Sequence, residues 1–265
     1  MPAETDVLSR IGAHTKKRVE RFKNDRSVSS LKASELYSRV PRDFKKAFEG
    51  SFPRVIAEVK FASPSAGFLR QEQPSAESAT RIALSYLDHG AAALSILTER
   101  NFFAGAPEYL ESVRRARPEA PLLMKDFFLD PYQFELARAC GADCVLLIVA
   151  LIGGELKQML AQAQNLGLSV LVEVHDEVEL GAAEAAGATL IGVNSRDLRT
   201  LKTDLNVARR LAPLAGGACL IAESGLKSRE ELKELSSLGY KGFLVGTTLM
   251  RVEDPGKALA ELMAP

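Results

Sequence analysis

Acidic and basic side chains stand at the ends of apolar runs of the sequence, where they could exchange protons. Glu58 and Lys60 lie two positions apart at the end of one run, Lys125 ends a second, and Glu173 lies in a third. A lysine among carboxylates stays charged and can donate a proton, whereas a carboxylate beside a lysine stays ionised and can accept one. If the fold brings these four residues together, they predict general acid–base catalysis.

Two small-residue dipeptides, Ser224-Gly225 and Gly246-Thr247, each come between an apolar run and a helical segment. Glycine lets the oxygens of a ligand approach backbone N–H groups, and the N-terminus of a helix favours an anion. Either dipeptide alone is an ordinary turn after a strand. Together they predict a phosphate cradle, and therefore a phosphorylated small molecule as the ligand.

Histidine and cysteine provide no metal-ligand pattern. They are scattered, without HxxxH or CxxC spacing, as His14, His89, His175, Cys140, Cys144 and Cys219. We therefore expect no metal site, and we interpret the cysteines as small core residues in a reducing cytosol. For His175, at the end of an apolar run, a supporting or surface position is the ordinary interpretation. No GxGxxG follows a strand and no GxSxG is present, so no cofactor is predicted.

Eight short runs rich in Val, Ile and Leu alternate with helical segments from residue 55 onward. The runs span residues 55–60, 93–98, 122–127, 144–150, 170–175, 190–195, 220–224 and 243–247. Apolar strands with interposed helices indicate a parallel sheet covered by helices. Eight evenly spaced units predict a closed (β/α)8 TIM barrel, and the alternative is an open doubly wound sheet.

Such a barrel would position the charged residues at one place, because TIM-barrel chemistry lies at the carboxyl ends of the strands. Six of the runs end in polar residues there, and the run over residues 190–195 brings Asn194 to this end. Side chains alternate along a strand, so Glu58 and Lys60 point to the same side. Lys125 and Glu173 would meet them from two other strands. For any single one of these residues, a structural ion pair is the alternative interpretation.

The first 50 residues differ from the rest of the chain. They contain 12 Lys/Arg and 7 Asp/Glu, a local charge of +5, and show partial helical periodicity. We expect one domain over residues 1–265, with a helical extension over 1–50 and the barrel over 51–265. The ordinary interpretation of the extension is solvated helices packed on the barrel, and the sharper one is a basic lid that attracts an anionic substrate.

The composition excludes several classes of protein. Of the 265 residues, 46% are hydrophobic, which is enough for a core and excludes global disorder. The net charge of zero argues against a nucleic-acid-binding chain. The longest apolar run, residues 144–152, is far shorter than the about 20 residues of a membrane span. With no secretory signal visible, we expect a cytoplasmic protein that has no membrane or nucleic-acid partner.

Seven stretches of the sequence carry a family resemblance. They are IAEVKFASPSAG (56–67), LTERNFFAG (97–105), LLMKDFFLDPYQFELARACGADCVLLIVA (122–150), LVEVHDEVEL (171–180), IGVNSRDLRTL (191–201), AESG (222–225) and FLVGTTLM (243–250). Together they resemble the indole-3-glycerol phosphate synthases, and the likeness covers nearly the whole chain from about residue 5. The Lys-Asp-Phe block and the Glu-x-Lys…Ser-Pro-Ser block distinguish that family from other phosphate-binding barrels.

The resemblance implies a reaction of tryptophan biosynthesis that needs no metal and no cofactor. It converts 1-(2-carboxyphenylamino)-1-deoxyribulose 5-phosphate to indole-3-glycerol phosphate, CO2 and water, by ring closure, decarboxylation and dehydration. The resemblance also implies that the N-terminal extension covers the top of the barrel.

The resemblance assigns roles to individual residues. Lys125 would protonate the alkoxide formed on ring closure, and Glu58, Lys60 and Glu173 would carry the dehydration, with the choice of base left open. The implied catalytic residues are Lys125, Glu58, Lys60, Glu173, Asn194 and Ser224. The implied substrate-binding residues are Ser63, Phe103, Phe127, Leu146, Arg196, Gly225, Gly246 and Thr247. Core packing is the alternative for the apolar members of this set.

Some features depart from the family, and two other functions compete. Phe61 stands where the family commonly has a basic residue, and without any tryptophan an aromatic clamp in the extension would have to be Phe22 or another residue. Phosphoribosylanthranilate isomerase would need a Cys–Asp pair at strand ends, whereas Cys144 starts its strand. A non-catalytic scaffold would have lost at least one of the four charged residues, and all are present.

Overall fold

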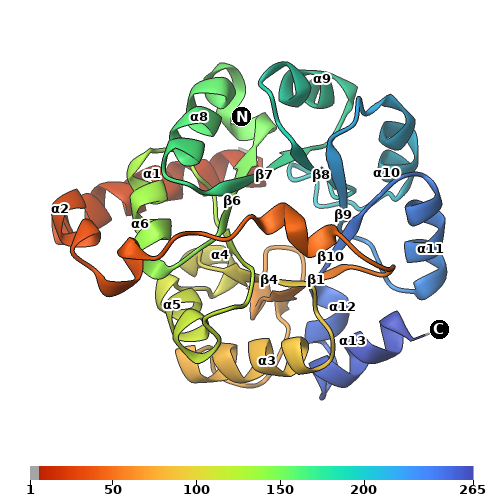
Figure 1. Cartoon of the computed structure of the whole chain (residues 1–265), viewed down its shortest axis with the longest axis horizontal. Coiled ribbons are helices and arrows are strands. Elements are labelled where there is room, and N and C mark those ends of the chain that lie inside the picture. The colour runs from red at the N-terminus through yellow and green to blue at the C-terminus, as the bar shows by residue number, and fades with distance from the viewer. Residues whose placement is uncertain (1–5, 265) are drawn as a thin grey trace, which may run out of the picture.

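The computed structural model describes residues 6–264, and its centre is a closed barrel of eight parallel strands (Figure 1). In barrel order they are β1 (Val55–Val59), β4 (Ala93–Leu97), β5 (Leu122–Lys125), β6 (Cys144–Ile148), β7 (Ser169–Val174), β8 (Leu190–Asn194), β9 (Cys219–Glu223) and β10 (Gly242–Val245). The barrel closes because β10 pairs with β1, with Val55 opposite Phe243. The predicted (β/α)8 barrel is therefore confirmed, and the open sheet is excluded.

Helices surround the barrel and connect its strands (Figure 1). The long ones are α3 (Ala76–Asp88), α5 (Pro107–Ala116), α6 (Tyr132–Cys140), α8 (Leu156–Asn165), α9 (Glu177–Ala185), α10 (Asn206–Leu211), α11 (Arg229–Ser237) and α13 (Pro255–Met263). Short elements follow some strands at their carboxyl ends: the hairpin β2 (Ala62–Ser63) and β3 (Gly67–Phe68), α4 (Arg100–Phe103), α7 (Val149–Ile152) with η3 (Gly153–Glu155), and α12 (Thr247–Met250). Another 3-10 turn, η4 (Ala212–Leu214), follows α10. No helix of the described residues is long and apolar enough to cross a membrane.

Two apolar layers stabilise the barrel. The larger lies between the strands and the surrounding helices, and the smaller fills the barrel interior with side chains such as Ile56, Leu123, Leu171 and Leu244. Cys144 belongs to this interior layer, at the start of β6. Because each strand alternates between the two layers, a charged residue two positions beyond an interior side chain must point into the mouth, the end where the strands finish.

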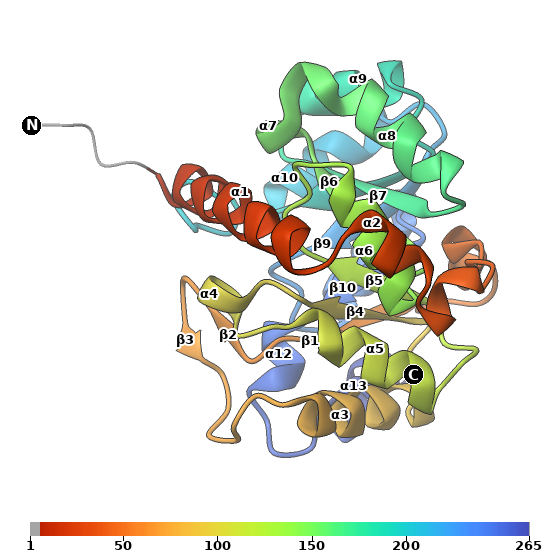
Figure 2. The ribbon, with the colours of Figure 1, turned by 90° about the vertical axis from the view of Figure 1, so that its left-hand side faces the viewer.

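The N-terminal extension contacts both ends of the barrel (Figure 2). It consists of α1 (Val7–Asp25), α2 (Val28–Lys32), η1 (Glu35–Ser38) and η2 (Phe44–Phe48). Leu8 and Ile11 of α1 line the mouth. Phe48 of η2 instead packs at the start of β10, where a Cβ added at Gly242 would meet its ring, and the Phe44 amide donates to Ser169 Oγ at the start of β7. The expected cover of the mouth by residues 1–50 is therefore corrected: α1 provides it, whereas η2 closes the opposite end with its buried phenylalanines.

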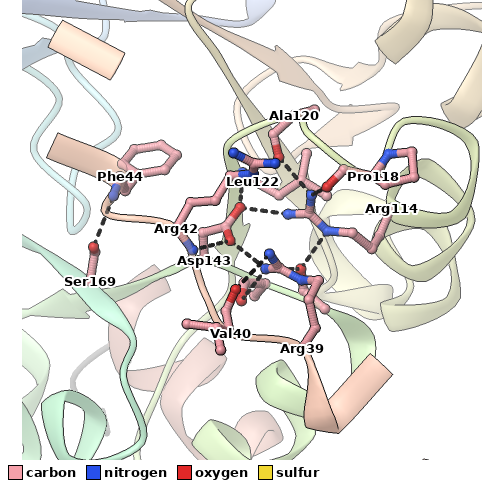
Figure 3. Close-up of polar contacts among 12 residues, drawn as sticks. Arg39, Val40, Arg42, Phe44, Arg114, Pro118, Ala120, Leu122, Asp143 and Ser169 are labelled. Carbon is pink, nitrogen blue, oxygen red and sulfur yellow. Dashed lines mark hydrogen bonds and ion pairs between the residues drawn. The ribbon is translucent and has the colours of Figure 1, made fainter. Parts of the chain in front are cut away.

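A buried carboxylate ties the extension to the barrel (Figure 3). Asp143, just before β6, is fully buried and accepts hydrogen bonds from Arg114 Nη2 at 2.5 Å, the Leu122 amide at 2.9 Å and the Arg42 amide at 2.8 Å. Arg39 adds a further ion pair to the same side chain. Asp143 thus joins α5 and β5 to the segment that leads into η2.

Arg114 is the buried counterion of Asp143. Only 1% of it is exposed, and its remaining N–H groups donate to the carbonyls of Gly141, Pro118 and Ala120. Burial lowers the pKa of Arg114, and the attraction of Asp143 works against this effect. A charge pair so completely enclosed depends on both partners, because either one alone would be an uncompensated buried charge.

Candidate active site

A pocket opens at the mouth of the barrel, and five strands each end in a polar side chain that lines it. These side chains are Glu58 of β1 with Lys60 just after that strand, Lys125 of β5, Glu173 of β7, Asn194 of β8 and Glu223 of β9. All of them are buried or nearly so. Val7, Leu8 and Ile11 of α1 add apolar walls. Charged side chains at the strand ends therefore form the floor of the pocket, and apolar side chains of α1 form part of its rim.

Lys125 lies at the centre of this floor, between two carboxylates. Its Nζ atom is 2.7 Å from Glu223 Oε2 and 3.1 Å from Glu173 Oε2. Burial by itself lowers the pKa of Lys125, but Glu223, Glu173 and Glu58 outweigh it and raise that pKa above its usual value. Lys125 is therefore a charged ammonium that can donate a proton into the pocket.

The two carboxylates around Lys125 have pKa values shifted in opposite directions. Burial opposes the charge on Glu173, but Lys125 and His175 overcome it and hold the pKa of Glu173 well below its usual range. Asn194 Nδ2 also donates to Glu173 Oε1 at 3.0 Å. Burial raises the pKa of Glu223, since Lys125 offsets it only in part. One neighbour of Lys125 is thus firmly ionised, and the other takes up a proton more easily.

A second acid–base pair lies beside the first. Lys60 Nζ is 2.8 Å from Glu58 Oε2, and Ser95 Oγ is 3.4 Å from the other oxygen of Glu58. A Cβ added at Gly246 would lie 2.3 Å from Glu58 Oε2. Gly246 therefore makes room for the Glu58 carboxylate, in addition to the role expected of it towards a phosphate.

An adjoining hollow lies over the loops after β9 and β10, and Lys60 lines both cavities. Its other residues include Ser224, Gly225, Gly246, Thr247, Lys227 and Arg251. Ser224 has a φ of 64° and Gly225 a φ of 82°, so the chain turns sharply here. A Cβ at Gly225 would be 2.8 Å from Thr203 Cγ2, which leaves no space for a side chain. The hollow thus combines cationic side chains with a tight small-residue turn.

The remaining predicted binding residues also lie along the first pocket. Phe103 and Phe127 face each other with ring centroids 6.0 Å apart, and Leu146 extends this apolar wall. Arg196, whose Nη1 donates to the Leu201 carbonyl at 2.8 Å, and Ser63 also line the pocket. The structure thus gathers every predicted site residue on the two adjoining cavities, and their roles stay predictions.

Phe61 and Phe22, the two aromatic residues that the sequence singled out, do not line the pocket. Phe61 is 2% exposed and packs against Tyr109 in the layer between the strands and the helices. The Phe61 side chain therefore does not point into the pocket. Phe22 is not among the pocket residues, and its carbonyl accepts a hydrogen bond from Tyr132 on α6. The part of α1 that lines the pocket is aliphatic, so Phe22, which the sequence left as one candidate for an aromatic clamp, does not form one.

The sequence interpretation missed Glu223 and the glycine that admits it. Glu223 lies two positions after the interior residue Ile221, so the alternation that identified Glu58 could also have found it. Gly192 lies on the neighbouring strand β8, and a Cβ there would fall 2.0 Å from Glu223 Oε1. Any side chain at position 192 would displace Glu223 from Lys125.

Comparison with known proteins agrees with this geometry. A family model described as Indole-3-glycerol phosphate synthase matches residues 8–262. Curated proteins of that name include one from Carboxydothermus hydrogenoformans, 48% identical over 213 residues and 79% of each chain. Another, from Acidithiobacillus ferrooxidans, is 42% identical over 264 residues, 97% of this chain and 98% of the relative.

Solved structures are similar in fold. 3-Hexulose-6-phosphate synthase from Salmonella typhimurium has a TM-score of 0.65 at 14% identity and covers 80% of this chain and 97% of its own. A mutant tryptophan synthase alpha-subunit from Pyrococcus furiosus has a TM-score of 0.62 at 16% identity, covering 80% and 98%. These identities establish the barrel and nothing more. The match over residues 8–262 and the identities above 40% establish more: the chain belongs to the indole-3-glycerol phosphate synthase family.

Proposed function

We propose that the chain closes the indole ring of its family's product, with Lys125 as the acid of the first step. The substrate is 1-(2-carboxyphenylamino)-1-deoxyribulose 5-phosphate, and the products are indole-3-glycerol phosphate, CO2 and water. The observation that carries the proposal is the position of the Lys125 ammonium, which is held between Glu173 and Glu223 on the floor of the pocket. A second lysine–carboxylate pair, Lys60 with Glu58, lies in the same pocket.

Ring closure requires one acid and one stabilising anion. The aromatic carbon that bears the carboxylate attacks the ketone carbon, a C–C bond forms, and the ketone oxygen takes a proton from Lys125. Positive charge then develops on the ring nitrogen. Glu173 is suited to stabilise this charge because it stays ionised. The C–CO2 bond next breaks, and its electron pair restores the aromatic ring.

Dehydration requires a second acid and a base. The hydroxyl leaves as water with one added proton, and the carbon next to the nitrogen loses a proton. Lys60 and Glu58, 2.8 Å apart, are suited to these two tasks, and they are separate from the pair that serves ring closure. We therefore propose Lys60 as the acid and Glu58 as the base of dehydration.

The hollow beside Lys60 is the proposed phosphate site. Replacing Thr247 with aspartate is expected to raise KM about tenfold or more, because the new carboxylate would repel the phosphate. kcat should change little, since Thr247 contacts neither acid. The measurement is steady-state kinetics with the substrate over a range of concentrations.

Thr189, an exposed residue just before β8 at the opposite end of the barrel, provides the control substitution Thr189→Asp. It should leave KM unchanged. Equal KM values for wild type and Thr247→Asp would locate the phosphate away from this hollow.

The two competing functions fit less well. An isomerase that uses a cysteine would need a thiol at the mouth, but Cys144 is buried in the barrel interior at the start of β6, and burial raises its pKa. A binding scaffold has no need for two lysine–carboxylate sets on one pocket floor. The isomerase therefore lacks the thiol that it needs among the described residues at the mouth, and the scaffold leaves the two lysine–carboxylate sets unexplained.

A further inference from the structure

His175 follows β7 and joins Glu173 to a carboxylate outside the reaction pocket. Its Nε2 atom lies 3.4 Å from Glu173 Oε1, and its Nδ1 atom lies 3.0 Å from Glu179 Oε2. The imidazole side chain is 15% exposed and lines a second cavity, which shares Leu8, Asn194 and Leu198 with the pocket. It therefore bridges two carboxylates, on the side of Glu173 away from Lys125.

Glu179 is held in place by the start of α9. Asp176 caps this helix and accepts a hydrogen bond from the Glu179 amide at 2.9 Å. The Glu179 carboxylate reaches back and accepts hydrogen bonds from the His175 backbone amide at 2.8 Å and from its ring. The contacts to the Asp176 carboxylate and to the His175 backbone amide hold Glu179, and the hydrogen bond between Glu179 and Nδ1 holds the imidazole, so rotation of the ring away from Glu173 would break that bond.

The surroundings of His175 favour its charged form. Burial lowers its pKa, but Glu173 and Glu179 more than compensate and raise it to about 10. The other charged residues that line its cavity are Asp176, Asp197 and Arg199, and Lys125 lies beyond Glu173. At neutral pH, Glu173 therefore has a cation on each side.

The two cations behave differently during ring closure. Lys125 becomes a neutral amine when it gives its proton to the ketone oxygen, and Glu173, a carboxylate that is only 1% exposed, then loses one of its two neighbouring cations. His175 takes no part in that transfer and keeps its charge. We propose that His175, locked by Glu179, is a positioning residue that keeps Glu173 ionised and oriented while Lys125 is neutral.

The inference rests on the proposed function and is tested by replacing His175 with glutamine and with lysine. Glutamine keeps hydrogen-bonding capacity without charge, so kcat should fall about tenfold while KM stays near the wild-type value, since the loss concerns the transition state. Lysine restores a cation and should recover part of the loss.

The pH profile separates this role from a structural one. The advantage of histidine over glutamine is present below the pKa of His175 and is lost as pH rises through about 10, so the ratio of kcat values should fall towards one there. Glu179→Gln should lower kcat in the same direction. Glu177→Gln, on the exposed face of the same helix, is the matched control and should have no effect.

A pH-independent ratio, or a lysine variant no more active than the glutamine variant, would overturn the inference and leave the proposed function intact. Absence of product from the wild-type chain would overturn both. Thermal melting of each variant shows whether a loss of kcat comes from unfolding, and a folded Glu179→Gln chain with wild-type kinetics would also contradict the inference.

Discussion

Replacing Lys125 with methionine is expected to lower kcat by about 10²–10⁴-fold, the range that a positioned acid contributes. Methionine fills a similar volume but has no proton to donate. It also leaves Glu173 and Glu223 facing the same space without their shared cation, so their repulsion raises the pKa of the pair. Substrate affinity should stay close to that of the wild type, because the phosphate and ring contacts are elsewhere. Stopped-flow ring closure and equilibrium binding measure the two quantities.

Lys241→Met is the matched control, because Lys241 is exposed and precedes β10 at the opposite end of the barrel. It should leave kcat unchanged. A Lys125→Met chain that keeps more than about a tenth of the wild-type kcat would exclude Lys125 as the acid, since a positioned acid is worth more than that.

Replacing Asp143 with asparagine is expected to lower the free energy of unfolding by about 3–5 kcal/mol. The substitution keeps the shape of the side chain, but it leaves the Arg114 guanidinium buried without a counterion. It also weakens the ion pair to Arg39 and the bond from the Arg42 amide, which hold the segment leading into η2. Urea unfolding followed by circular dichroism measures the change.

The control is Glu234→Gln, which breaks the exposed pair between α11 and Arg209 of α10. Its unfolding midpoint should stay close to the wild-type value, because exposed pairs contribute little. If Asp143→Asn were as stable as this control, the anchoring role of the buried carboxylate would be wrong. Ring-closing activity of the folded Asp143→Asn chain should persist, since Asp143 lies at the end of the barrel opposite the pocket.

The barrel could be predicted from the sequence because its signal is local. Each of the eight apolar runs is bounded by helical segments, and the runs match the observed strands to within a few residues. The positions of Glu58 and Lys60 followed from alternation along a single strand. Such features need only the period of one element and its place in the order.

Features that depend on contacts between elements were missed. Glu223 contacts Lys125 across the barrel, and no spacing in the sequence records which carboxylate a central lysine meets. Gly192 looks like any glycine in a strand until the position of the Glu223 side chain on the neighbouring strand is known. The extension shows the same limit, because its apolar faces indicate burial but not against which end of the barrel.

His175 illustrates a middle case. Its place at a strand end was evident, and a supporting position was the ordinary interpretation. The bridge to Glu173 depends on Glu179, which lies four residues on, in the first turn of α9, where Asp176 caps the helix and accepts a hydrogen bond from the Glu179 amide. The pattern was present in the sequence, but its consequence for Glu173 required the three-dimensional arrangement.

The most direct test of the account is turnover by the purified full-length chain. The carboxyphenylamino-deoxyribulose phosphate is added without metal, and indole fluorescence and released CO2 are followed together. The account predicts indole-3-glycerol phosphate and CO2 in equal amounts from the wild-type protein, and turnover by Lys125→Met that is slower by about 10²–10⁴-fold. A folded chain that binds the substrate but forms no product would contradict it.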